Sequence, residues 1–114
     1  MSTAENRQQR RVTFSAPIEY FCWDQRKSAY AQEISCEGLF LRTPEVLPEG
    51  SMLTLRLRLP GSGRAFTVLG KVVHVVLGSA TLHRGLGIHF LDLAPRDRDA
   101  LQAYVASRPQ SLAA

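Results

Sequence analysis

The chain has 114 residues, enough for one domain built around one modest hydrophobic core. Its net charge of +4 permits an anionic partner but does not require one, because a cationic surface also keeps a protein soluble. No apolar run approaches the roughly 18 to 20 residues that a membrane helix needs. Residues 1–11 lack the apolar centre of a signal peptide, and Cys22 and Cys36 form no CxxC pair. These features predict a cytoplasmic protein with reduced cysteines and no membrane span.

Residues 1–11 are polar and aperiodic, which predicts a flexible N-terminal arm. Segments with strand patterns follow, separated by turns rich in glycine, proline and polar residues. The clearest is 52–59, where leucines alternate with polar residues at the period of a half-buried strand. Gly70 suggests a bulge within a later strand. The expected strands are 12–21, 28–35, 39–43, 52–59, 66–76 and 84–90.

The pattern changes after residue 90. Pro95 suits the first turn of a helix, and Leu101, Tyr104 and Val105 recur at spacings that form one apolar stripe. Six short strands and one helix predict a mainly β fold, a six-stranded antiparallel β-barrel with a C-terminal α-helix. We divide the chain into an arm, the barrel with its helix, and a tail: 1–11, 12–107 and 108–114.

Three arginines, Arg7, Arg10 and Arg11, precede the first expected strand. A guanidinium is a planar fork of donors that fits phosphate oxygens and the O6/N7 edge of guanine, and it can stack on a base. Arg7 and Arg11 are four residues apart, so on a loop they can approach one compact anion from different sides. A second cluster, Glu-Ile-Ser-Cys-Glu-Gly, occupies 33–38. Together the two clusters predict a site for a guanine nucleotide.

These clusters resemble the signature of PilZ domains, which is RxxxR before the first strand and then [D/N]xSxxG. Arg7 and Arg11 fill the first motif, and Ser35 and Gly38 fill part of the second. The resemblance extends over nearly the whole chain, including the segments 38–43, 70–73 and 85–90. It implies a PilZ-type barrel whose ligand is cyclic di-GMP and which needs no cofactor.

By this resemblance, Arg7 and Arg11 contact guanine Hoogsteen edges and phosphates and stack on the bases. Arg10 lies between them and either adds a phosphate contact or contributes nothing. Ser35 offers its hydroxyl to a phosphate or a base. Gly38 permits either a positive φ or a close approach of the backbone.

Glu33 departs from the family pattern, because it stands where the family has Asp or Asn. By the resemblance, that side chain pairs with the Watson–Crick edge of a guanine. Glu33 keeps the acceptor oxygens but is one methylene longer, and a shift of about 1 Å is enough to spoil a fixed hydrogen-bond geometry. The departure predicts weakened binding of cyclic di-GMP.

Other residue types indicate no separate site. The histidines are not at metal-ligand spacing, so no metal site is expected, and they are assigned to strands or loops: His74, His83 and His89. No nucleophile–base pair is evident in the sequence, so no catalytic residues are expected. Three aromatic side chains are interpreted as core or rim packing: Trp23, Phe40 and Phe66.

The first functional interpretation is a non-enzymatic cyclic di-GMP receptor that acts on a separate output protein. Motility, attachment and exopolysaccharide output are the processes that the resemblance implies. The alternative keeps the fold without the ligand, as a degenerate PilZ-fold adaptor for protein interactions, and Glu33 favours it. Nucleic-acid binding has only the basic charge in its favour, because the sequence lacks a pattern of interleaved basic and aromatic residues.

Overall fold

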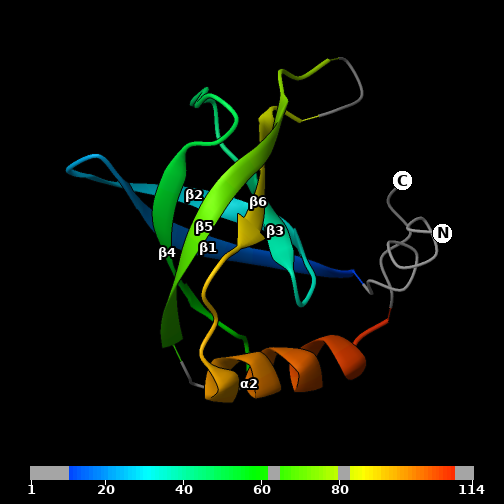
Figure 1. Cartoon of the computed structure of the whole chain (residues 1–114). Coiled ribbons are helices and arrows are strands. Elements are labelled where there is room, and N and C mark those ends of the chain that lie inside the picture. Colours follow the sequence, from blue (N-terminus) through cyan, green and yellow to red (C-terminus); the bar gives the residue numbers. More distant parts are fainter. Residues whose placement is uncertain (1–10, 62–64, 80–82, 110–114) are drawn as a thin grey trace, which may run out of the picture.

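The computed structural model describes residues 11–61, 65–79 and 83–109. In this part of the chain, strands run consecutively and one helix follows them, α2 (Pro95–Ala106). The strands are β1 (Val12–Cys22), β2 (Gln25–Ile34), β3 (Gly38–Arg42), β4 (Met52–Arg58), β5 (Ala65–Val76) and β6 (Gly85–Phe90). They form a closed antiparallel barrel in the order β1-β2-β3-β6-β5-β4, as Figure 1 shows. The predicted fold, a six-stranded antiparallel barrel with a C-terminal helix, is confirmed.

The barrel closes through β1, which is long enough to serve two neighbours. Its pairing with β2 extends from Val12 to Cys22, whereas its pairing with β4 is confined to the segment from Glu19 to Phe21. A register shift between Thr13 and Ala16 bends the strand before it reaches β4. Over the residue pairs from Glu19 to Phe21, β1 and β4 pair with each other where an open sheet would have two free edges.

The interior of the barrel follows from alternation along the strands. On β4, Leu53, Leu55 and Leu57 are buried, while Arg56 and Arg58 are exposed. Side chains of a strand point alternately to the two faces, so this sequence places one row of leucines in the core. Burial of such side chains is the main favourable term in forming the barrel.

A buried tyrosine ties the segment after β3 to the first hairpin. Tyr20 is 1% exposed, and its hydroxyl donates to Glu45 Oε1 at 2.6 Å and lies 3.3 Å from Thr43 Oγ1. Lys27 Nζ lies 3.1 Å from Glu45 Oε2. Burial, and then the hydrogen bond to Glu45, raise the pKa of Tyr20 to about 12, so the neutral hydroxyl is the form that the fold stabilises.

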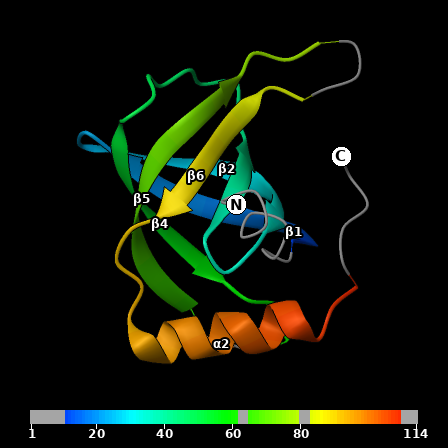
Figure 2. The same cartoon turned by 45° about the vertical axis from the view of Figure 1, so that its right-hand side comes forward.

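The helix α2 lies across one end of the barrel, which both views show (Figures 1 and 2). Pro95 occupies its first turn, and the predicted stripe buries Leu101 and Val105. The Tyr104 ring meets the Phe14 ring edge-on, with 5.9 Å between the centroids. The helix therefore closes the core at this end. Among the described residues, no helix is long and apolar enough to cross a membrane.

The first hairpin differs from the sequence-based expectation. Its turn consists of Trp23 and Asp24 alone, and β2 begins at Gln25 rather than at residue 28. Trp23 has a φ of 61° and is 91% exposed, so its expected packing role is wrong. A two-residue hairpin loop requires such left-handed backbone, which overrides the preference of tryptophan for extended conformations.

The irregularity in β5 also lies elsewhere than expected. The register with β6 shifts between Val72 and His74, not at Gly70. Gly70 is buried, and a Cβ there would lie 2.5 Å from Ile88 Cγ2. The glycine therefore provides room for a core side chain. The shift exposes both Val73 and His74 on the outer face, where they contribute to a pocket.

Candidate functional site

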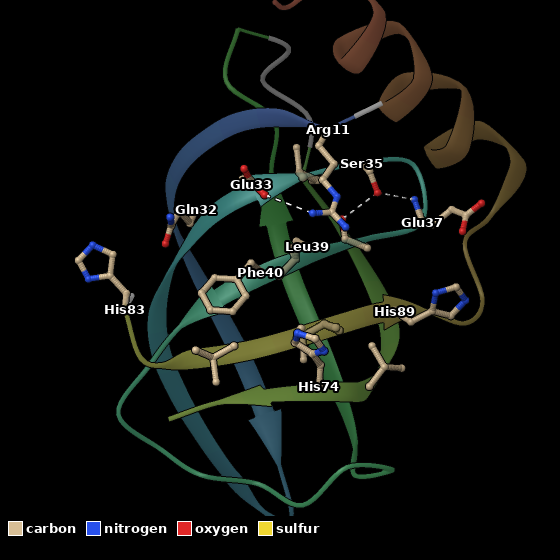
Figure 3. Close-up of a pocket in the computed structure, with 16 residues that line it drawn as sticks. Arg11, Gln32, Glu33, Ser35, Glu37, Leu39, Phe40, His74, His83 and His89 are labelled. Carbon is tan, nitrogen blue, oxygen red and sulfur yellow. Dashed lines mark hydrogen bonds and ion pairs between the residues drawn. The ribbon is translucent and has the colours of Figure 1, made fainter. Parts of the chain in front are cut away.

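A pocket of about 470 Å³ lies on the outer face of the barrel, where β2, β3, β6 and β5 run side by side (Figure 3). The residues that line it come from both motif clusters and from the last two strands. They are Arg11, Gln32, Glu33, Ile34, Ser35, Glu37, Gly38, Leu39, Phe40, Val73, His74, Val76, His83, Gly87, Ile88 and His89.

One cross-strand row forms the middle of the pocket. Glu33 pairs with Phe40, Phe40 with Gly87, and Gly87 with His74, so these four residues follow one another across the four strands. Gly87 has no side chain, and a Cβ at this position would lie 3.2 Å from His74 Cβ. The absence of a side chain at Gly87 therefore leaves a gap between the Phe40 ring and the His74 imidazole. Any larger residue at position 87 would narrow the pocket.

A tight turn between β2 and β3 forms one wall. Ser35 N donates to the Gly38 carbonyl at 2.9 Å, and Glu37 N donates to Ser35 Oγ at 3.1 Å. Ser35 Oγ also lies 3.4 Å from the Gly38 carbonyl oxygen, to which it donates. Phe90 N donates to the Glu37 carbonyl at 2.8 Å and fastens the turn to the end of β6. The buried hydroxyl of Ser35 thus organises the backbone of this wall.

Gly38 is required because β3 and β6 approach closely at this point. Its φ is not positive, but a Cβ added here would overlap the Ile88 carbonyl oxygen. That oxygen belongs to the backbone of β6, which cannot move aside without disturbing the pairing of Gly38 with His89. Of the two roles expected for this glycine, the close backbone approach is the one found.

Arg11 and Glu33 face each other across the pocket mouth. Arg11 Nη1 lies 3.8 Å from Glu33 Oε1, with the arginine side chain 64% exposed and the glutamate side chain 16% exposed. Figure 3 shows the guanidinium reaching from the start of β1 toward Glu33 on β2. An ion pair that is long and largely solvated on one side contributes little to stability. Arg11 can therefore turn toward an anion at small cost.

The predicted site residues within the described part of the chain all line one pocket: Arg11, Glu33, Ser35 and Gly38. The two sequence clusters meet because β1 and β2 are antiparallel and pair Thr13 with Glu33, which places Arg11 beside the end of β2. Ser35 and Gly38 follow in the adjoining turn. Arg7 and Arg10, with the rest of the predicted arm before Arg11, lie outside the described residues.

The opposite wall was not predicted from the sequence. His74, His83, His89 and Phe40 line the pocket, although they were assigned to strands, loops or packing. The alternation Gly85-x-Gly87-x-His89 on β6 is the signal that could have indicated a hollowed outer face. Within the described ranges, no group of three or more histidine, cysteine or acidic residues is arranged to hold a metal ion.

Cys36, between the motif residues Ser35 and Gly38, does not have the properties of an activated nucleophile. Burial raises the pKa of its thiol, and this outweighs the nearby Arg98 guanidinium, which lowers it. Reactive cysteines have depressed pKa values and accessible thiolates, whereas Cys36 is half-buried and packs against the core. Its position in the turn is structural.

The PilZ domain family matches residues 5–107 of the sequence. Among proteins with curated functions, none matches it. The solved structures that share the fold include three PilZ-domain proteins. The inhibitor of motility (MotI/DgrA) from Bacillus subtilis has a TM-score of 0.78 and 19% identity over 88% of this chain, and the match covers 49% of that protein. The chain thus spans about half the length of that relative.

The other two structures are single PilZ domains of similar length. The PilZ domain of YcgR from Escherichia coli, solved with c-di-GMP, has a TM-score of 0.67 and 14% identity, with 89% of each chain covered. The PilZ domain of CeSA from a cellulose-synthesizing bacterium has a TM-score of 0.60 and 16% identity, covering 85% of this chain and 95% of that one. At such identities the similarity shows a common fold.

Proposed function

Because the chain belongs to the PilZ domain family, we propose that it is a non-enzymatic receptor for cyclic di-GMP that acts on a separate output protein. The observation that carries the proposal is the meeting of two distant sequence clusters at one pocket. Arg11 comes from the first cluster, and Glu33 and Ser35 come from the second. A volume of about 470 Å³ is within the range of small-molecule sites, which is roughly 300 to 1,000 Å³.

The chemistry of the pocket suits a ligand that combines anionic phosphates with flat bases. Arg11 supplies a donor fork for a phosphate oxygen or a guanine edge. Glu33 supplies acceptor oxygens for guanine N–H groups. The Phe40 and His74 rings line the opposite part of the pocket, where aromatic faces can contact a base. In this proposal, Arg7 and Arg10 add further donors from the arm when the ligand is bound.

The names of the structural relatives support the choice of ligand and process. The YcgR domain was solved with c-di-GMP, and the Bacillus relative is named as an inhibitor of motility. We therefore propose control of motility, attachment or exopolysaccharide output as the process. The partner is a separate chain in this proposal, and the ligand changes the surface that this partner contacts.

Titration calorimetry with cyclic di-GMP tests the proposal. We expect Arg7→Ala and Arg11→Ala each to weaken binding by about 1 to 3 kcal/mol, the range for good bidentate guanine contacts. Arg56→Ala is the matched control, because Arg56 is an exposed arginine on β4 that does not line the pocket. GTP serves as the ligand control. Absence of binding by the unmodified chain, or equal losses in all three variants, would refute the proposal.

A second candidate function is a PilZ-fold adaptor that binds no cyclic di-GMP. Glu33 favours it, because it stands where the PilZ signature has Asp or Asn and its side chain is one methylene longer. The exposed Trp23 at the first hairpin tip offers a contact for another protein. The unmodified chain and Glu33→Asp distinguish the two functions. If Glu33 holds its carboxylate out of register, Glu33→Asp tightens binding about tenfold, whereas an adaptor shows no binding in either form.

A further inference from the structure

Gln32 lies at a bulge beside the predicted site residue Glu33. On β2 the pairing with β3 passes from Ala31, opposite Leu41, directly to Glu33, opposite Phe40. Gln32 is therefore an extra residue without a counterpart on β3. Successive residues of a regular strand point to opposite faces, and a bulge suspends this alternation locally. The bulge explains how two consecutive side chains, Gln32 and Glu33, can both line the pocket.

The side-chain carbonyl of Gln32 is the feature that points to a ligand. Among the described residues, it is the buried side-chain oxygen that has no hydrogen-bond partner. A buried acceptor that is left unsatisfied destabilises the fold, and nearly all such groups in native proteins are paired. In Figure 3 the Gln32 amide lies at the end of the pocket between Glu33 and His83. Because this oxygen is buried, a donor that enters the pocket becomes its partner when the Gln32 side chain turns toward the pocket.

We propose that Gln32 is a base-recognition residue, whose amide turns into the pocket and accepts an N–H hydrogen bond from a guanine of the ligand. The inference rests on the proposed function and adds a residue to it. Guanine presents two adjacent N–H donors on its Watson–Crick edge, at N1 and at the 2-amino group. Gln32 and Glu33 both line the pocket, and with the Gln32 amide turned inward they offer an acceptor oxygen to each of these donors. Adenine presents an acceptor at its N1, which meets these oxygens unfavourably.

The chemistry of the pair predicts selectivity as well as affinity. A site built to pair with a donor rejects an analogue that lacks it, because its own polar groups remain unpaired. We expect the unmodified chain to prefer cyclic di-GMP to cyclic di-AMP. Loss of the Gln32 amide should reduce this preference, since the remaining acceptor is Glu33 alone.

Gln32→Met tests the inference, because methionine has a similar length and shape but lacks the amide. Gln102→Met is the matched control, at an exposed position on α2 away from the pocket. Calorimetry with cyclic di-GMP and cyclic di-AMP gives the affinities, and thermal melting of the free proteins gives the stabilities. We expect Gln32→Met to bind cyclic di-GMP about tenfold more weakly, which is about 1.4 kcal/mol, yet to melt at or above the temperature of the unmodified chain. Gln102→Met should change neither property.

The two measurements separate the possible outcomes. If the unmodified chain binds and Gln32→Met binds equally well, the inference is wrong while the proposed function stands. If Gln32→Met melts at a lower temperature, its amide has a structural role and the inference is also wrong. If the unmodified chain does not bind cyclic di-GMP, the proposed function fails, and the role of Gln32 fails with it.

Discussion

The substitution Gly38→Ala tests whether the PilZ motif glycine serves the fold through close backbone contact. A Cβ at this position would overlap the Ile88 carbonyl oxygen and lie 3.1 Å from the Ile88 carbonyl carbon and 3.2 Å from His89 Cα. All three atoms belong to the backbone of β6, so no side-chain rotation relieves the overlap. Overpacking of this kind typically costs 1 to 3 kcal/mol, and we place Gly38→Ala at about 3 kcal/mol because rigid backbone must shift.

The loss should appear as a lower melting temperature of the free protein. A cost of about 3 kcal/mol corresponds to a decrease of about 12 °C in a domain of this size. Gly87→Ala is the control on the same face, because its nearest neighbour is the His74 side chain, with Cβ at 3.2 Å. We expect that variant to stay within about 1 kcal/mol of the unmodified chain, since a contact of 3.2 Å is relieved by a shift of a few tenths of an ångström, whereas the Cβ at position 38 would overlap a backbone oxygen. Equal melting temperatures for the two variants would show that the β3–β6 approach does not require glycine.

Three further predictions concern stability. Tyr20 has its pKa raised from an ordinary 10 to about 12, so its neutral form stabilises the fold at neutral pH. This contribution to the free energy of unfolding should be complete below pH 10 and fall by about 2 kcal/mol by pH 11.5. Denaturant unfolding of the unmodified chain below pH 10 and at pH 11.5 should show this fall, and Tyr20→Phe should not show it. Parallel pH profiles of stability for the two proteins would contradict the reasoning. Leu101→Ala should lower the free energy of unfolding by about 3 kcal/mol, because this fully buried side chain packs α2 on the barrel; a loss below 1 kcal/mol would mean that the helix is dispensable. Trp23→Asn should raise stability by up to about 1 kcal/mol, because asparagine accepts the φ of 61° more readily. A clear decrease in the melting temperature would indicate that the exposed indole ring of Trp23 packs against the rest of the protein.

Local sequence patterns were sufficient to predict the fold and part of the site. The alternation on β4 between Met52 and Arg58 determines which face is buried, because side chains alternate along any extended strand. The stripe of Leu101 and Val105 likewise determines the face that α2 buries. The motif residues within the described part of the chain, Arg11, Ser35 and Gly38, were found by their spacing, and the structure places them with Glu33 at one pocket.

The opposite wall of that pocket depends on tertiary structure. Gly87 and His74 are neighbours because of the strand order and because the β5 register shifts after Val72, and neither property is encoded in a short segment. The bulge at Gln32 depends on how β2 pairs with β3, so the sequence alone did not indicate that Gln32 and Glu33 share one face. Alternation is a local property of the chain, whereas register and bulges are settled by packing between strands, and these decided which side chains surround the pocket.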